Sequence, residues 1–408
     1  MPARAILLLT FLIASLFVTA GPLSAKTVRE APVSVFDPVL MAQGDSSVAS
    51  ARGYRSLFIN PAAFALGQGN FTLLNLQGWI HSSPTQALES MQLFFGESDI
   101  EEGDTSLSRL ERQLSSNGMG VGAAGGIGYV GGGLGLGLRF ASDSYFFGEQ
   151  LPGGITGTST SEISFVGGLG FPFQLGPVQV AIGGSVRPFV RVRSLFDSDA
   201  SDAALQKFLG VPGEIEEDYR DITRSLNGYG FALDAGLLLQ YRDFTLGIAG
   251  RHLGDTRLNY SEHSLSEVRD SLSNGALPAE KSEGEEGYIP VGQHIIPTRF
   301  DFGLMWAPRP WDVARPQLHL ELRDPMGWAD PSGTGSQPLL YRTHLGGELE
   351  LMRFFSIRAG LNQGRPTGGL GLRLFFFDLN MALYGRELGE QQGDTSSAGA
   401  ALEFGIRF

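Results

Sequence analysis

Residues 397–408 read SAGAALEFGIRF, and this stretch decides the fold because its side chains alternate between two kinds. One kind is apolar, while the other is small or charged and includes Glu403 and Arg407. Successive side chains of a β-strand point to opposite faces, so a period of two predicts a strand with one apolar face. The apolar positions are Ala398, Ala400, Leu402, Phe404, Ile406 and Phe408.

The same alternation recurs upstream and predicts fourteen strands in all. Most of them have about the 9–11 residues that a tilted strand needs to cross a bilayer. The predicted strands are 71–81, 119–130, 132–142, 160–171, 176–188, 229–241, 243–253, 297–307, 315–325, 339–351, 354–362, 366–375, 376–386 and 397–408.

The connections between these strands alternate in length almost throughout. Segments 82–118, 189–228 and 254–296 are long, whereas the joins at Gly131 and 172–175 are short. Outer-membrane barrels have short periplasmic turns and longer extracellular loops, whereas a soluble sandwich has no reason to sort its loops by end. We therefore predict an all-β protein, a transmembrane antiparallel β-barrel of about 14 strands in the bacterial outer membrane.

The N-terminus predicts export. Arg4 precedes the apolar run AILLLTFLIASLFVTA at 5–20, which is shorter than the roughly 20 apolar residues of a membrane anchor. Residues 1–25 are thus expected to be a signal peptide, cleaved after Ala20 or Ala25. The expected organisation continues with an N-terminal hatch (plug) segment at 26–70 and the barrel at 71–408.

Composition excludes several classes of protein. The 408 residues include no cysteine, so disulfides, thiolate nucleophiles and cysteine-ligated metals are ruled out. A net charge of −13 argues against a nucleic-acid partner. The 57 glycines are about 14% of the chain, roughly twice the usual share. Many of them lie inside the predicted strands, where they leave room for a plug or a ligand against the wall.

Two segments resemble a known family. Gly44–Leu66 reads GDSSVASARGYRSLFINPAAFAL, and its small residues followed by an Asn-Pro-Ala turn resemble the hatch of the FadL/TodX outer-membrane transporters. Gly360–Gly389 resembles a broader FadL-like branch that includes PorV-type proteins. The resemblance implies a fourteen-stranded barrel plugged by a hatch, passive uptake of hydrophobic compounds such as long-chain fatty acids, and no cofactor or enzymatic activity. On this basis Asn60, Pro61 and Ala62 are the predicted hatch turn.

The first long connection supplies the candidate ligand-binding residues, because it gathers apolar side chains where solvent is expected. These are Leu88, Met91, Phe94 and Phe95. Segment 203–226 is acidic, and its apolar residues stand at a spacing that predicts amphipathic helices. Such helices either capture an apolar ligand or form a self-packing lid, and the spacing does not separate the two.

Partners follow from the predicted barrel. We expect outer-membrane lipid, a hydrophobic small molecule and, during biogenesis, the barrel-assembly machinery. The protein itself is expected to be a monomer. The terminal residues Leu402, Phe404, Ile406 and Phe408 resemble the strand that this machinery recognises.

Other motifs in the sequence give weaker evidence about function. Gly126–Gly131 spells the dinucleotide-binding G-x-G-x-x-G, but a strand follows it instead of the required helix. His319 and His344 are expected to line the lumen near Glu321 and Glu348, and no metal site is predicted. The inward charges of both signs predict salt bridges around a plug, with a selective aqueous pore as the alternative.

Three functional hypotheses remain. The first is a hatch-gated channel for hydrophobic compounds, the second a FadL-like scaffold for secretion or surface attachment, and the third a general porin.

Overall fold

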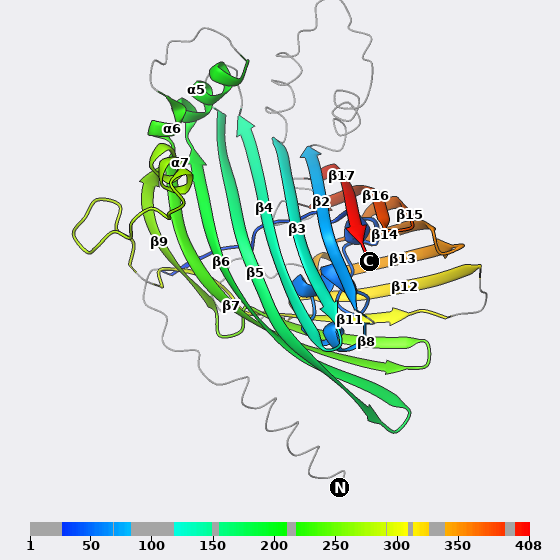
Figure 1. The fold of residues 1–408 in the computed structure, drawn as a ribbon. Coiled ribbons are helices and arrows are strands. Elements are labelled where there is room, and N and C mark those ends of the chain that lie inside the picture. The colour runs from blue at the N-terminus through cyan, green and yellow to red at the C-terminus, as the bar shows by residue number, and fades with distance from the viewer. Residues whose placement is uncertain are drawn as a thin grey trace, which may run out of the picture.

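A computed structural model describes residues 27–67, 69–82, 118–148, 155–209, 218–290, 292–308, 313–325, 339–387 and 396–408. The chain forms one closed antiparallel barrel with its N-terminal segment inside (Figure 1). The first strands of the wall are β2 (Asn70–Ser82), β3 (Met119–Gly131), β4 (Leu134–Gly148), β5 (Ile155–Leu175), β6 (Val178–Phe196), β7 (Arg224–Tyr241) and β8 (Phe244–Arg251). The others are β9 (Thr256–Ser264), β10 (His294–Ile296), β11 (Arg299–Trp306), β12 (Ala314–Arg323), β13 (Thr343–Leu351), β14 (Phe355–Asn362), β15 (Arg365–Leu374), β16 (Phe377–Glu387) and β17 (Ser396–Arg407).

Pairing closes the wall completely. The last strand, β17, pairs antiparallel with the first, β2, from Ala398 opposite Ser82 down to Arg407 opposite Thr72. Strands β8 and β9 both pair with β7 and form two halves of one wall strand, and β11 and β10 continue each other in the same way. The barrel therefore has 14 strands, as the alternation predicted. Closure leaves no unpaired edge, which a lipid environment requires.

An apolar band surrounds the outside of the barrel. On β4, Leu136, Leu138 and Phe140 point outward and are 40–45% exposed, while Gly137 between them is buried. Leucine and phenylalanine in such numbers on an exposed face are stable in lipid and not in water. The chain is thus a transmembrane barrel of the bacterial outer membrane.

Above this band the outward side chains become polar while the strands continue. Ser142 of β4 bonds Ser161 of β5 at 2.9 Å, and Ser144 bonds Ser159 at 2.8 Å. The sequence placed 143–159 and 189–228 in loops, because the apolar alternation stops where the lipid stops. Backbone pairing needs no apolar side chain, so β5 and β6 reach 21 and 19 residues.

One wall strand is broken at His252–Asp255. His252, Gly254 and Asp255 have φ values of 55°, 78° and 58°, the left-handed region that side chains rarely adopt. Thr298 holds the break, since its hydroxyl donates to the carbonyl of His252 at 2.8 Å and its amide to Asp255 at 2.7 Å. The segment predicted as the loop 254–296 therefore contains strands β9 and β10, because the break interrupts the alternation by which strands were located.

Helices α5 (Ser198–Leu209), α6 (Tyr219–Ile222) and α7 (Leu265–Ser273) gather at the end of the barrel that carries the long connections (Figure 1). Of the helical segment predicted over 203–226, the described residues 203–209 belong to α5 and 219–222 form α6, whereas β7 already begins at Arg224. Among the described residues, no helix combines the length and the apolarity that crossing a membrane demands.

Residues 28–66, hereafter the inner segment, run through the lumen. The segment begins with β1 (Val28–Arg29), which pairs parallel to β10. It continues through α2 (Pro38–Ala42) and the 3-10 turns η1 (Gly53–Phe58) and η2 (Pro61–Ala65). Phe64, Ala62 and Leu57 are at most 1% exposed, so the apolar core of this protein lies inside the barrel, between the inner segment and the wall.

Candidate functional site

The inner segment fits the lumen because the wall facing it is lined with glycine. A Cβ on Gly183 would meet the backbone of Pro61, and a Cβ on Gly236 would meet the side chain of Asn60. Gly128, Gly135, Gly137, Gly170, Gly247, Gly303, Gly346, Gly360 and Gly369 face residues of the inner segment in the same way. We call these eleven positions the glycine ring. A side chain at these positions would collide with the backbone or a side chain of the inner segment, which is the steric reason for glycine at each of them.

The predicted turn Asn60-Pro61-Ala62 lies within this ring. Asn60 is fully buried, and its amide Nδ2 donates to the carbonyl of Val48 at 3.0 Å. Its Oδ1 accepts from the amide of Ala62 at 3.1 Å and caps η2, where Pro61 fits the first position. An asparagine side chain therefore ties two parts of the inner segment together against β6 and β7.

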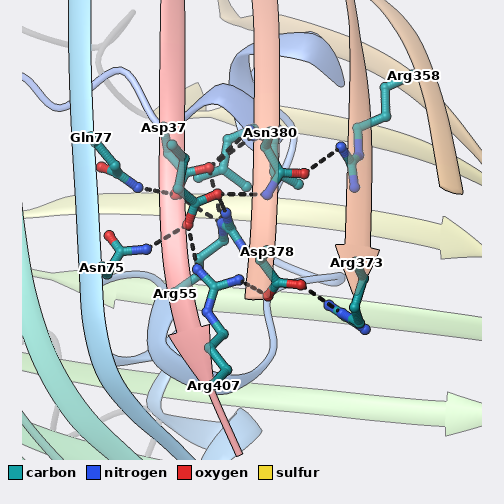
Figure 2. A network of polar contacts seen from close by, with 12 residues as sticks. Asp37, Arg55, Asn75, Gln77, Arg358, Arg373, Asp378, Asn380 and Arg407 are labelled. Atoms are coloured by element: carbon teal, nitrogen blue, oxygen red, sulfur yellow. Dashed lines mark hydrogen bonds and ion pairs between the residues drawn. The ribbon is translucent and has the colours of Figure 1, made fainter. Parts of the chain in front are cut away.

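A buried polar cluster fastens the inner segment to the wall, and Figure 2 shows it from close by. Arg55 of η1 donates to Asp37 at 2.8 Å and also pairs with Glu403 of β17. Gln77 of β2 donates to the same oxygen of Asp37, Oδ2, at 2.6 Å. Glu403 also accepts from Arg407, Asn75 and Asn380. Because a buried charge needs partners, we expect this set, the Arg55 cluster, to hold the segment in one position.

A second set of charges holds the turn that follows α2. Glu321 of β12 is fully buried and accepts from the backbone amides of Ser47 (2.5 Å) and Val48 (2.8 Å). Arg323 of the same strand pairs with Asp45. Burial raises the pKa of the Asp45 carboxyl, but the Arg323 guanidinium outweighs burial and holds that pKa below its usual value.

The start of the inner segment is held by a third set. Glu30 accepts from Tyr260 at 3.0 Å, lies 2.7 Å from the Nδ1 of His294, and pairs with Arg191 at 3.4 Å. Arg191 also donates to Glu162 at 2.7 Å. Residues of the inner segment and of the wall thus form ion pairs with one another. This is the salt-bridge lattice around a plug that the sequence predicted, and the inward charges in these pairs are not free to line an aqueous pore.

Between these anchors one aromatic side chain of the inner segment enters a box of wall residues. The ring of Phe36 lies parallel to Tyr384 of β16 at 5.4 Å and meets Trp79 of β2 edge-on at 5.6 Å. His81 lies 5.2 Å away, and the guanidinium of Arg386 lies 5.0 Å from the ring. We call these four wall residues the aromatic box. Stacked and edge-on contacts of this kind are favourable beyond the area they bury.

A cavity of about 350 Å³ opens at the long-connection end of the lumen, where strands β4 to β7 end. Its walls are mostly apolar, with one carboxylate and one guanidinium at the edge. Tyr145 lines this cavity and also stacks on His81 at 5.8 Å, so a continuous series of rings joins the cavity to the box. The lining residues are Tyr145, Phe147, Thr156, Gly157, Thr158, Leu195, Phe196, Asp197 and Arg224.

The candidate ligand residues Leu88, Met91, Phe94 and Phe95 lie outside the described residues. Of the terminal residues, Leu402 and Phe404 point to the lipid face, and the rings of Phe404 and Phe377 lie 5.9 Å apart. Ile406 lies on the same strand, β17. Phe408 stacks on Phe376 at 5.6 Å, and its backbone pairs with Phe71. Their role in assembly stays a prediction.

The two histidines expected in the lumen lie there, and the glycine motif lies in a strand. His319 and His344 are buried on the lumen side, and His344 Nδ1 lies 2.9 Å from the carbonyl of Gly44. No group of three metal-ligating side chains comes together within the described ranges. Gly126–Gly131 lies in β3 and pairs with β4.

Sequence reasoning missed the aromatic box altogether. Phe36 stands in the short run VSVFDP at 33–38, which carries no alternation and no motif. A usable signal exists on the wall, since Trp79, His81, Tyr384 and Arg386 all occupy lumen-facing positions of predicted strands. Only the pairing of β16, β17 and β2 brings them together.

No protein-family model matches the chain, and no curated protein is similar to it in sequence. Solved structures do resemble it. The toluene transporter TodX of Pseudomonas putida is 12% identical, over 93% of this chain and 98% of its own, with a TM-score of 0.46. The monoaromatic hydrocarbon channel CymD is 13% identical, over 91% and 96%, also at 0.46. The translocator domain of the autotransporter NalP from Neisseria meningitidis is 11% identical, over 84% and 89%, at 0.37. The chain is a 14-stranded outer-membrane β-barrel, and TodX and CymD are among the solved structures that it resembles.

Proposed function

We propose that this protein is a passive channel through which hydrophobic compounds, long-chain fatty acids among them, enter across the outer membrane. The observation that carries the proposal is the mostly apolar cavity at the rim of the barrel, one of whose residues, Tyr145, stacks on His81 of the aromatic box. Such a cavity suits an apolar solute, because burying apolar surface is favourable and needs no specific partner.

The inner segment is the gate in this proposal. All of its described contacts with the wall are non-covalent, since the chain has no cysteine. Polar solutes would have to pass a lumen closed by the glycine ring and three sets of ion pairs. An apolar compound instead gains binding energy in the cavity before it reaches the segment, and that energy is available to displace it.

Uptake into liposomes tests the proposal. The full-length protein is reconstituted, and entry of labelled oleate and toluene is compared with entry of a small sugar. We expect faster uptake of the hydrophobic probes than in protein-free liposomes, with little change for the sugar. Rapid sugar entry together with a large steady conductance in planar bilayers would identify a general porin instead. Mass spectrometry after gentle extraction should find a bound apolar molecule, and this molecule should be lost when Leu88, Phe94 and Phe95 are made polar.

The scaffold hypothesis makes the opposite forecast. A protein that serves only as a surface or secretion partner shows no probe uptake above the protein-free control, and a stable protein complex is recovered on extraction. That pair of results would replace the channel proposal.

A further inference from the structure

Phe36 is held in the aromatic box like a bound ligand. It lies in residues 30–37, which form no helix or strand, yet its ring is only 5% exposed. All four walls of the box belong to the barrel, two from β2 and two from β16. The side chain therefore enters a preformed site from a separate element, as a ligand would.

The wall is shaped to leave this site open. A Cβ on Gly120 would meet His81, and a Cβ on Gly122 would meet Trp79, so these two glycines of β3 let both rings lie across the strand. Gly399 of β17 allows the same for Tyr384. The nearest atoms to these three glycines belong to the wall and not to the inner segment. Their role is therefore to make room for the rings of the box.

Phe36 gives the polar groups of the box neither an anion nor a hydrogen bond. No carboxylate in the described part of the chain lies within ion-pair distance of Arg386, whose guanidinium lies over the Phe36 ring. The neighbouring acids are engaged elsewhere, Asp143 with the indole of Trp79 at 2.8 Å and Asp45 with Arg323. Tyr384 Oη and His81 Nδ1 are buried and have no hydrogen-bond partner among the described residues. The ring of Phe36 fills the box, but it gives Arg386 no anionic partner and gives Tyr384 Oη and His81 Nδ1 no hydrogen bond.

We propose that the aromatic box is a binding site for compounds that carry an aromatic ring and an anionic group, and that Phe36 occupies it until such a compound displaces the side chain. The ring replaces that of Phe36 against Tyr384 and Trp79, and the anion pairs with Arg386. This inference rests on the proposed function only for the route by which the ligand arrives.

Displacement of Phe36 reaches the gate through the next residue. Asp37 accepts from Arg55 and Gln77, and its Oδ1 caps α2 through the amide of Val39 at 2.9 Å. In this proposal the backbone at Phe36 shifts when the ring leaves the box, and Asp37 is the next residue along that backbone. Binding is thereby coupled to the Arg55 cluster and to release of the inner segment.

Calorimetric titration of the full-length protein in detergent with 4-phenylbutyrate tests the site. Phe36→Ala removes the internal competitor, so we expect the probe to bind about tenfold more tightly or better. Adding Arg386→Gln to that variant is expected to reverse the gain for 4-phenylbutyrate but not for neutral butylbenzene. Phe36→Leu, which keeps the apolar contact and loses ring stacking, serves if the alanine variant does not fold, and a smaller gain is expected.

Phe58→Ala is the matched control, because Phe58 belongs to the same segment and also lies against an arginine, 3.9 Å from Arg139, but outside the box. It should leave the affinity unchanged. Equal gains from Phe58→Ala and Phe36→Ala, or equal affinity for hexanoate and 4-phenylbutyrate, would overturn the inference. So would a Phe36→Leu variant that binds the probe no better than the wild type. If binding fails while liposomes still admit oleate and toluene, only this inference falls; if both fail, the proposed function falls with it.

Discussion

Single buried side chains decide whether the inner segment stays in place. Arg55 is the central one, since it pairs with Asp37 inside the segment and with Glu403 in the wall. Its side chain is 15% exposed and that of Glu403 is fully buried. Breaking a buried ion pair by removing one partner leaves a charge without compensation, which costs about 3–5 kcal/mol. Exposed pairs are worth about 0–1 kcal/mol, so position in the lumen matters more than the presence of a charge.

Arg55→Gln should therefore loosen the inner segment. We expect more frequent channel openings and a higher mean conductance in planar bilayers, because Asp37 and Glu403 lose their shared cation. Arg373→Gln provides the control, since Asp378 is the one ion-pair partner of Arg373 among the described residues and the Arg373 side chain is 63% exposed. Conductance that is unchanged by Arg55→Gln, or changed equally by both substitutions, would mean that the Arg55 cluster is not what holds the segment.

Strands present two faces, and their glycines have different roles on each. Gly183 and Gly184 are neighbours on β6, but a Cβ on Gly183 would run into Pro61, whereas one on Gly184 would have only the carbonyl of Asp234 within reach, at 3.9 Å. Alternation thus turns one glycine toward the inner segment and the next toward the lipid. The outward glycine is not required by any contact.

Gly183→Ala is expected to disturb the seat of the Asn60 turn, and Gly184→Ala is expected to leave it intact. Overpacking of this kind typically costs about 1–3 kcal/mol, and the cost falls on the segment because the wall is fixed by its pairing. Limited proteolysis of folded protein measures the effect as faster cleavage within residues 28–66. Equal cleavage of the two variants would show that the ring glycines do not position the segment.

Element order and wall strands could be predicted from the sequence because the apolar alternation continues wherever a strand faces lipid. Leu136, Leu138 and Phe140 face the lipid, and their alternation with other residues was enough to predict β4. The upper strand halves could not be located, since Ser142 and Ser144 face outward above the lipid and carry no apolar signal. The box was likewise invisible, because Phe36 and Tyr384 meet only after 14 strands have closed the barrel.

At the scale of the whole molecule, wall and inner segment are held by different forces. The wall closes through backbone pairing from β2 round to β17, and none of those pairings uses a residue of the inner segment except the short contact of β1 with β10. Glu321 keeps Arg323 as a partner when the segment is absent, and water that enters the lumen replaces the amides of Ser47 and Val48. The barrel should consequently survive removal of the segment, while the lumen should not stay closed.

Deletion of residues 28–66, with the export signal kept, is expected to give a folded but open barrel. Heat-modifiable gel migration checks the folding, and a large steady conductance together with rapid entry of a small sugar into liposomes checks the opening. Full-length protein should show neither the conductance nor the sugar entry. A deletion variant that folds and yet remains closed would place the barrier in the long connections, and one that loses heat-modifiable migration would make the inner segment part of what closes the wall. The first result would separate the gate from residues 28–66, and the second would contradict the independence of the wall from the segment. The expected result makes the segment the barrier between the cavity at the rim and the far side of the membrane.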